Sequence, residues 1–107
     1  MLLHSNHYLT ERFKAVDTAP QYQPDSYHRL DRIRSLVDQH YGQINIEIFM
    51  EILADHDHHP NSICRHIDSA APISWTSLAS FIMVPAKGAI YIAAGHPCEY
   101  GYVQYEF

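Results

Sequence analysis

Apolar residues in this chain follow a helical period in its first half and form β-rich runs in its second half. Between residues 26 and 41 they recur at steps of three and four, which predicts a helix with one buried stripe made of Tyr27, Leu30, Ile33, Val37 and Tyr41. The other predicted elements are a shorter helix over residues 45–54 and β-rich runs at 76–84, 89–94 and 100–107. This order predicts an α+β domain in which two helices cover one face of an antiparallel sheet.

Capping and turn residues bound these elements. We expect Asp25 or Ser26 to cap the first helix and Gly42 to end it in the left-handed conformation. Asn45 is the expected N-cap of the second helix. Residues 85–88 read Pro-Ala-Lys-Gly, and four connecting residues that end in glycine predict a hairpin between the first two β-rich runs.

Three stretches lie outside these elements. Residues 1–9 are interpreted as a short strand or strand end, and residues 10–25, which are polar and hold two prolines, as a surface loop. Residues 54–75 are a second long loop, and long loops in small domains are often functional. Two short helices and a few strands leave one face of the sheet without a partner. We therefore expect residues 1–107 to be a single domain with an incomplete core.

The composition excludes several classes of partner. Seven basic and twelve acidic residues give a net charge of −5, which argues against a nucleic-acid binder. The apolar runs are far shorter than the about 20 residues of a membrane span. The N-terminus also lacks a signal-peptide pattern, so we expect no membrane association. Two cysteines are too few for a disulfide-built fold. We expect free thiols and a cytoplasmic protein.

The most unusual chemistry is a run of histidines with a cysteine close behind it. Residues 55–59 read Asp-His-Asp-His-His, and imidazole, thiolate and carboxylate groups are the ligands of zinc. The spacing fits no standard site, because a structural Cys–His zinc site normally presents a paired C-x(2–4)-C element. We therefore assign no metal ligand and no cofactor. A His-rich metal-binding protein remains an alternative, with the ligands His56, His58, His66 and, as an optional fourth, Cys64.

Two thiols could also act as nucleophiles. Cys64 or Cys98 would need a nearby base to lower the thiol pKa, and the nine histidines make such proximity common by chance. Free cysteine is usually a buried small apolar residue. We therefore favour spectator thiols.

Two polar residues stand out in mostly apolar or structured surroundings. Arg65 could bind a carboxylate or carbonyl of a substrate through its rigid N–H groups. It could equally form a structural ion pair with Asp55, Asp57 or Asp68. Asn6 lies near the end of the predicted first strand, where its amide could donate to an oxyanion or cap a turn.

Several strings, taken in chain order, resemble one family. They are His-Ser-Asn-His-Tyr-Leu at residues 4–9, Asp-His at 55–56, Pro-Asn-Ser-Ile-Cys-Arg-His at 60–66 and Gly-His-Pro-Cys-Glu at 95–99. Together they resemble the C-terminal part of the acyl-coenzyme A:6-aminopenicillanate acyltransferases, which are cysteine N-terminal-nucleophile (Ntn) hydrolases. The resemblance implies the C-terminal half of an αββα sandwich of two stacked antiparallel sheets. It also implies N-acyl transfer or amide hydrolysis.

The resemblance implies catalytic roles for two residues. Asn6 resembles the oxyanion-hole asparagine and Arg65 the late active-site arginine of the family. Neither Cys64 nor Cys98 matches the nucleophile, a cysteine exposed by autoproteolysis that lies upstream in family members.

From this we expect a partial Ntn-hydrolase domain that is inactive alone. It would pair with the N-terminal half of the same enzyme or form a homo-oligomer, and the full enzyme would bind an acyl-amide or acyl-coenzyme A substrate. The alternative is a self-associating relic domain without catalytic activity.

Overall fold

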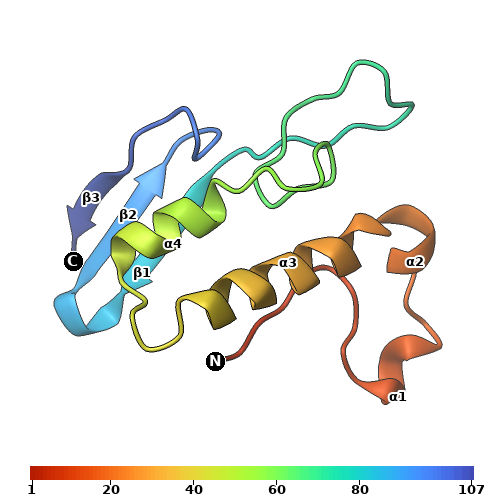
Figure 1. Ribbon diagram of the computed structural model, residues 1–107, viewed down its shortest axis with the longest axis horizontal. Coiled ribbons are helices and arrows are strands. Elements are labelled where there is room, and N and C mark those ends of the chain that lie inside the picture. The colour runs from red at the N-terminus through yellow and green to blue at the C-terminus, as the bar shows by residue number, and fades with distance from the viewer.

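Four helices and a three-stranded antiparallel sheet make up the computed structural model, which describes residues 1–107 (Figure 1). The helices are α1 (Glu11–Lys14), α2 (Ala19–Tyr22), α3 (Asp25–Gln39) and α4 (Ile46–Leu53). The strands are β1 (Ser80–Val84), β2 (Ala89–Ala93) and β3 (Val103–Glu106), and the 3-10 turn η1 (Pro85–Lys87) joins β1 to β2. The predicted α+β class is confirmed. None of the helices has the length and hydropathy of a membrane-spanning segment.

The longest helix, α3, lies where the apolar stripe predicts it. Leu30 and Val37 of that stripe are buried. The start of the helix differs from the prediction, because Pro24 occupies the N-cap position and no side chain caps the helix. Asp25 and Ser26 are both buried instead, and their side chains bind other segments of the chain.

The second helix and the turn before it follow the local sequence pattern. Gly42 has a φ of +79°, a backbone conformation that glycine adopts at little cost. The side-chain oxygen of Asn45 accepts a hydrogen bond from the N–H of Ile48 at 2.9 Å. The prediction for Asn45 is therefore confirmed, and Gly42 is left-handed as predicted, but α3 already ends at Gln39 with His40 as its C-cap. Ile52 is the buried side chain of α4.

The sheet is an antiparallel meander in the order β1-β2-β3. The predicted hairpin is confirmed, since η1 and Gly88 join β1 to β2 and Gly88 is left-handed with a φ of +60°. The N–H of Phe107 donates to the carbonyl of Gly88 at 2.9 Å, which fastens the C-terminus to this turn.

The two faces of the sheet differ in burial. One face carries Ile82, Ala89 and Ala93, which are buried, and α4 contacts β1. The opposite face is apolar across all three strands; by the strand register it consists of Phe81, Met83, Ile90, Ile92, Val103 and Tyr105. Four of these six side chains are more than half exposed. The chain therefore has one unpartnered apolar sheet face, as the shortage of core elements predicts.

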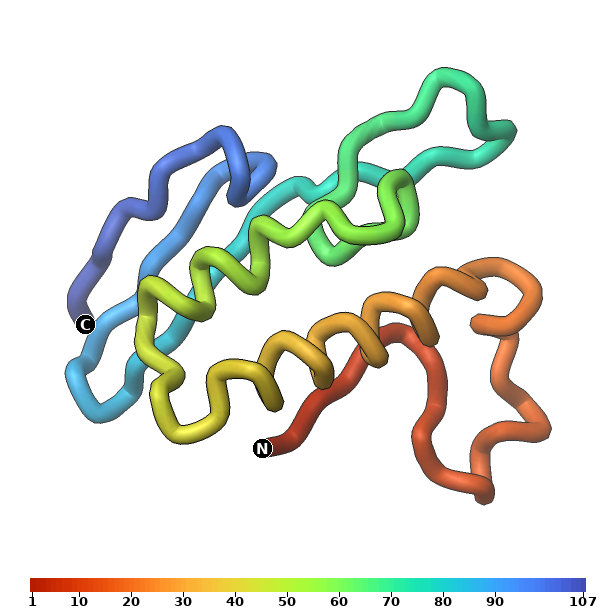
Figure 2. The backbone as a smooth tube through the Cα atoms, viewed as in Figure 1, coloured from red at the N-terminus to blue at the C-terminus, as the bar shows by residue number.

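Three expectations about the boundaries of elements are wrong. Residues 1–9 form no strand; they run beside α3 without joining the sheet (Figure 2). Residues 10–25 are not a continuous loop, because the four-residue helices α1 and α2 lie within them. Such helices are too short for an apolar period to reveal them. The β-rich run predicted from residue 76 pairs as a strand only from Ser80.

Candidate functional site

The N-terminal segment is held against α3 by one buried hydroxyl. The side chain of Ser26 is fully buried, and its Oγ accepts a hydrogen bond from the backbone N–H of Asn6 at 2.7 Å. The same Oγ lies 3.0 Å from Oγ of Ser5 and 2.8 Å from Nδ1 of His7. The His7 ring also stacks on Tyr27 with a centroid separation of 3.9 Å. These contacts fix the backbone position from which the Asn6 side chain projects.

The Asn6 amide has one bound end and one free end. Its Oδ1 accepts a hydrogen bond from Nη2 of Arg29 at 2.6 Å. Since the oxygen is used in this way, the orientation of the amide is set, and the structure gives its Nδ2 group no hydrogen-bond partner. An exposed amide N–H₂ group of fixed orientation is a suitable donor to a carbonyl oxygen or an oxyanion.

Arg65 is buried beside a carboxylate that it shares with Arg29. Its Nη1 lies 2.9 Å from Oδ2 of Asp25, and the same oxygen accepts from Nε of Arg29 at 2.9 Å. The side chains of Arg65 and Asp25 are only 12% and 6% exposed. Burial lowers the pKa of the Arg65 guanidinium, and Asp25 opposes that shift. Its Nε is buried without a hydrogen-bond partner, so one donor of this cation remains unused.

The two site residues predicted from the sequence are thus two ends of one polar network. It runs from Asn6 through Arg29 and Asp25 to Arg65. Sequence reasoning missed the two central residues. The i,i+4 spacing of Asp25 and Arg29 indicates a helical ion pair, but no local pattern indicates that Asn6 and Arg65 join its two ends.

The acids predicted as partners of Arg65 are wrong. Asp55, Asp57 and Asp68 are not its partners, because Asp25 takes that place. Asp55 instead makes a two-pronged contact with Arg32 of α3, at 2.7 and 3.0 Å. The hydrogen bond from Arg32 lowers the pKa of the Asp55 carboxyl, although partial burial opposes the shift.

Two small cavities adjoin the polar network. One of about 160 Å³ is lined by Arg65 together with Pro60, Asn61, Ala71, Ile73, Ser74 and Trp75. The other, of about 80 Å³, is lined by Arg29 with His4, Ser5, Ile33 and Ile63. Each has an arginine in a partly apolar wall, which suits a small group with one polar end.

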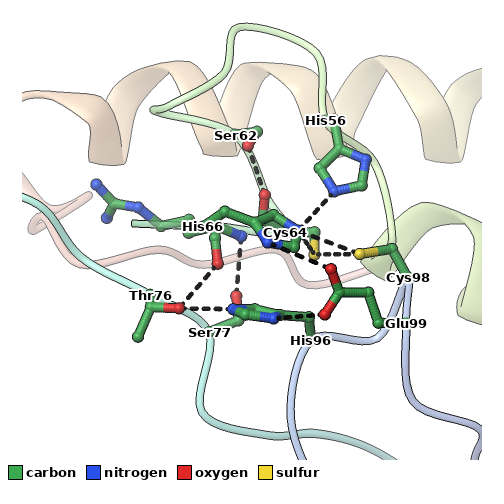
Figure 3. Close-up of polar contacts among 10 residues, drawn as sticks. His56, Ser62, Cys64, His66, Thr76, Ser77, His96, Cys98 and Glu99 are labelled. Atoms are coloured by element: carbon green, nitrogen blue, oxygen red, sulfur yellow. Dashed lines mark hydrogen bonds and ion pairs between the residues drawn. The ribbon is translucent and has the colours of Figure 1, made fainter. Parts of the chain in front are cut away.

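A second cluster of reactive side chains involves the loop that follows α4 (Figure 3). His56, Cys64, His66 and Cys98 direct their ring nitrogens and sulfurs toward one another, with all four atoms within 4.8 Å. Burial, followed by the contact with Cys98, raises the pKa of the Cys64 thiol to about 11. Burial, followed by repulsion from His96, lowers the pKa of His66.

This cluster differs from the one considered in the sequence. His58 does not belong to it, because its ring lies against His28 with a centroid separation of 4.2 Å. Cys98 does belong to it, although 32 residues separate it from His66. Cys64 and Cys98 are both free thiols, as expected.

An oriented amide donor and a guanidinium are groups that can bind a carbonyl or a carboxylate oxygen. The chain matches the profile of the acyl-coenzyme A:6-aminopenicillanic acid acyl-transferase family over residues 1–99. It therefore belongs to this family, and the resemblance seen in its motifs is confirmed. A comparison with curated proteins found no match.

Proposed function

We propose that this chain is the C-terminal segment of a cysteine Ntn acyltransferase or amidohydrolase that acts on amide-linked acyl groups. Its contribution to the active site is Asn6 and Arg65, and a separate N-terminal segment contributes the nucleophilic cysteine. The observation that supports this most directly is the network that joins Asn6 to Arg65 through Arg29 and Asp25. Membership of the acyltransferase family supports the type of reaction.

The two residues suit different parts of an acyl transfer. When a thiolate attacks an amide carbonyl, negative charge develops on the carbonyl oxygen, and an oriented N–H donor lowers the energy of that state. The free Nδ2 group of Asn6 is such a donor. Arg65 would bind a carboxylate or carbonyl elsewhere in the acyl-amide or acyl-coenzyme A substrate from the wall of the cavity of about 160 Å³, which it lines.

The chain's own thiols are poor candidates for the nucleophile. Cys64 is fully buried, and in the metal-free chain its raised pKa keeps the thiol protonated at neutral pH, whereas a nucleophilic cysteine acts as an accessible thiolate. Cys98 is exposed, but its sulfur contacts Cys64 and His66 and is not part of the Asn6–Arg65 network. These observations support a nucleophile that comes from another segment.

The apolar sheet face supports a partner for this domain. Phe81, Met83, Val103 and Tyr105 share one face of the sheet and are each 53–62% exposed. An exposed sheet face of this kind is typical of an association surface. We propose that the second sheet of an αββα sandwich, supplied by the N-terminal half of the enzyme, covers it. The runner-up is a second copy of this chain in a non-catalytic, self-associating domain.

The assembled enzyme provides the test. The chain is produced alone and together with a segment that bears the nucleophilic cysteine, and both are assayed for amide hydrolysis and transfer from acyl-coenzyme A. We expect turnover only from the combination. There, Asn6→Ala should lower kcat by about 10²–10³-fold, whereas Gln43→Ala, an exposed control, should leave it unchanged.

The same preparations test Arg65. We expect Arg65→Lys to raise KM or lower kcat, because a lysine cannot reproduce the guanidinium fork. The control is Arg34→Lys, since Arg34 only pairs with Asp31 at the surface. Full activity of Asn6→Ala and Arg65→Lys would overturn the site assignment. A stable homo-oligomer without activity in any combination would favour the relic domain instead.

A further inference from the structure

Four metal-binding atoms converge at a place that the acyl-transfer proposal does not use (Figure 3). His56 comes from the turn after α4, Cys64 and His66 from the following loop, and Cys98 from the turn after β2. The sulfur of Cys64 lies 3.6 Å from that of Cys98 and 3.8 Å from Nε2 of His66. Nε2 of His66 lies 3.2 Å from the Cys98 sulfur and 3.1 Å from Nε2 of His56.

These separations match the edges of a zinc tetrahedron. With Zn–S and Zn–N bonds of about 2.3 and 2.0–2.1 Å, a tetrahedral site requires about 3.8 Å between two sulfurs, about 3.6 Å between sulfur and nitrogen and about 3.3 Å between two nitrogens. Four of the six edges lie within about 0.4 Å of these values, and the His56 nitrogen lies within 4.8 Å of both sulfurs. We infer that His56, Cys64, His66 and Cys98 bind one Zn²⁺ ion as a four-coordinate structural site.

The surroundings of the cluster support this inference. Metal-binding histidines usually present their second ring nitrogen to a carboxylate or carbonyl. Nδ1 of His66 lies 3.9 Å from Oε1 of Glu99, whose other oxygen is 3.1 Å from Nδ1 of His96. The other nitrogen of His96 lies 2.7 Å from Oγ1 of Thr76. The contact with His96 therefore holds the Glu99 carboxylate beside Nδ1 of His66, and Nε2 of the same His66 ring faces the cluster.

Backbone contacts hold the ligands before any ion binds. The N–H of Cys64 donates to the carbonyl of Asp55 at 2.9 Å, so the segments that carry Cys64 and His56 are fastened together. Arg65 and Ser77 exchange hydrogen bonds at 2.9 and 3.0 Å, which fixes the backbone between the two ligands of the loop. Since all four coordination positions come from the protein, the site is closed to substrate and suits a structural role rather than a catalytic one.

Metal analysis of the whole chain tests the site. The protein is produced in zinc-containing medium, purified under reducing conditions without a metal-affinity column, and washed with a mild chelator. We expect one zinc per chain by elemental mass spectrometry. His56→Ala and Cys98→Ser should each lower zinc occupancy at least tenfold after the same wash. The matched control is His58→Ala, because His58 is an exposed histidine of the same turn outside the cluster.

Cobalt provides a readout that does not depend on zinc retention or on activity. Co²⁺ added to the chelator-stripped, reduced chain should give the intense visible absorption of a tetrahedral site and a thiolate-to-cobalt charge-transfer band. That band should weaken in Cys98→Ser. Because Cys98 is exposed, this substitution should leave the fold intact, and circular dichroism checks that it does. Cobalt binding by the wild type decides the question if a ligand variant does not fold.

Three results would overturn the site. The first is a reduced wild-type chain that takes up neither zinc nor cobalt. The second is equal loss of metal in His58→Ala and His56→Ala, which would indicate adventitious binding by surface histidines. The third is a Cys64–Cys98 disulfide in the isolated protein that, after reduction, leaves a chain without tetrahedral cobalt absorption.

Discussion

Replacement of Asp25 by asparagine tests whether the buried ion-pair network holds the candidate site together. Asp25 is 6% exposed, and one of its oxygens contacts both Arg29 and Arg65, which are 18% and 12% exposed. Asp25→Asn removes the only negative charge in contact with these two cations. Removal of one partner of a buried pair costs about 3–5 kcal/mol. The groups are too buried for solvent screening to reduce this figure to that of a surface pair.

The size of this loss makes it easy to measure. A domain of this length has a total stability of about 5–15 kcal/mol, so the variant would lose a large fraction of it. At about 4–8 °C per kcal/mol, the melting temperature should fall by more than about 10 °C. Urea unfolding followed by circular dichroism gives the free energy of unfolding directly. In the assembled enzyme we also expect a lower kcat, because Arg65 and Asn6 are both positioned through this carboxylate.

The matched control lies on the same helix. Asp31 pairs with Arg34 at 3.2 Å, but the two side chains are 76% and 53% exposed. Asp31→Asn makes the same chemical change and should cost no more than about 1 kcal/mol. If Asp25→Asn and Asp31→Asn lower the free energy of unfolding by the same amount, the Asp25 network is not a buried electrostatic anchor and our reasoning is wrong.

Three further predictions concern single contacts. Arg32 lowers the pKa of Asp55 below its ordinary 3.8. The pair therefore stabilises the fold above about pH 4 and loses this effect as the pH falls through the lowered pKa. The difference in free energy of unfolding between the wild type and Asp55→Asn, measured by urea unfolding, should disappear below about pH 4. Asn45→Ala should cost about 1 kcal/mol by the same measurement, with recovery in Asn45→Asp. Gly88→Ala should cost about 1–2 kcal/mol, because residue 88 is left-handed and a Cβ there would lie 2.9 Å from the carbonyl oxygen of Phe107. A comparable loss in Gly101→Ala, where a Cβ meets no neighbour, would contradict this explanation.

The features that could be predicted from the sequence are those set by nearby residues. The stripe of Leu30 and Val37 predicts α3 because an apolar period of 3.6 needs only one face to be buried. Asn45 and Gly88 mark a cap and a turn through conformations that depend on one or two residues. The first two strands follow from their β-rich composition and the third from its alternation, although the position where β1 begins depends on pairing with β2 and is not encoded locally.

The features that could not be predicted depend on contacts between distant segments. The local sequence predicts a capping role for Asp25, whereas its actual partner, Arg65, lies 40 residues further along the chain. Cys98 was not grouped with His56 for the same reason, and a search for regular ligand spacing does not find a site whose ligands come from three segments. A reactive residue can therefore be recognised from the sequence, although the distant residues that it contacts cannot.

Arg65 lies between the two unexpected clusters, and this position connects them. Its neighbours Cys64 and His66 direct their side chains into the four-ligand cluster, whereas its own guanidinium binds Asp25 of α3. Side chains alternate in direction along an extended segment, so two ligands separated by one residue can share a side while the residue between them faces away. No helix or strand occurs between Leu53 and Ser80, so only isolated hydrogen bonds, such as those between Arg65 and Ser77, hold the backbone of this segment in place. The carboxylate of Asp25 adds a restraint on one side, and the proposed metal ion would add another on the other side. The ion pair with Asp25 compensates for the burial of the Arg65 guanidinium in a chain with so small a core.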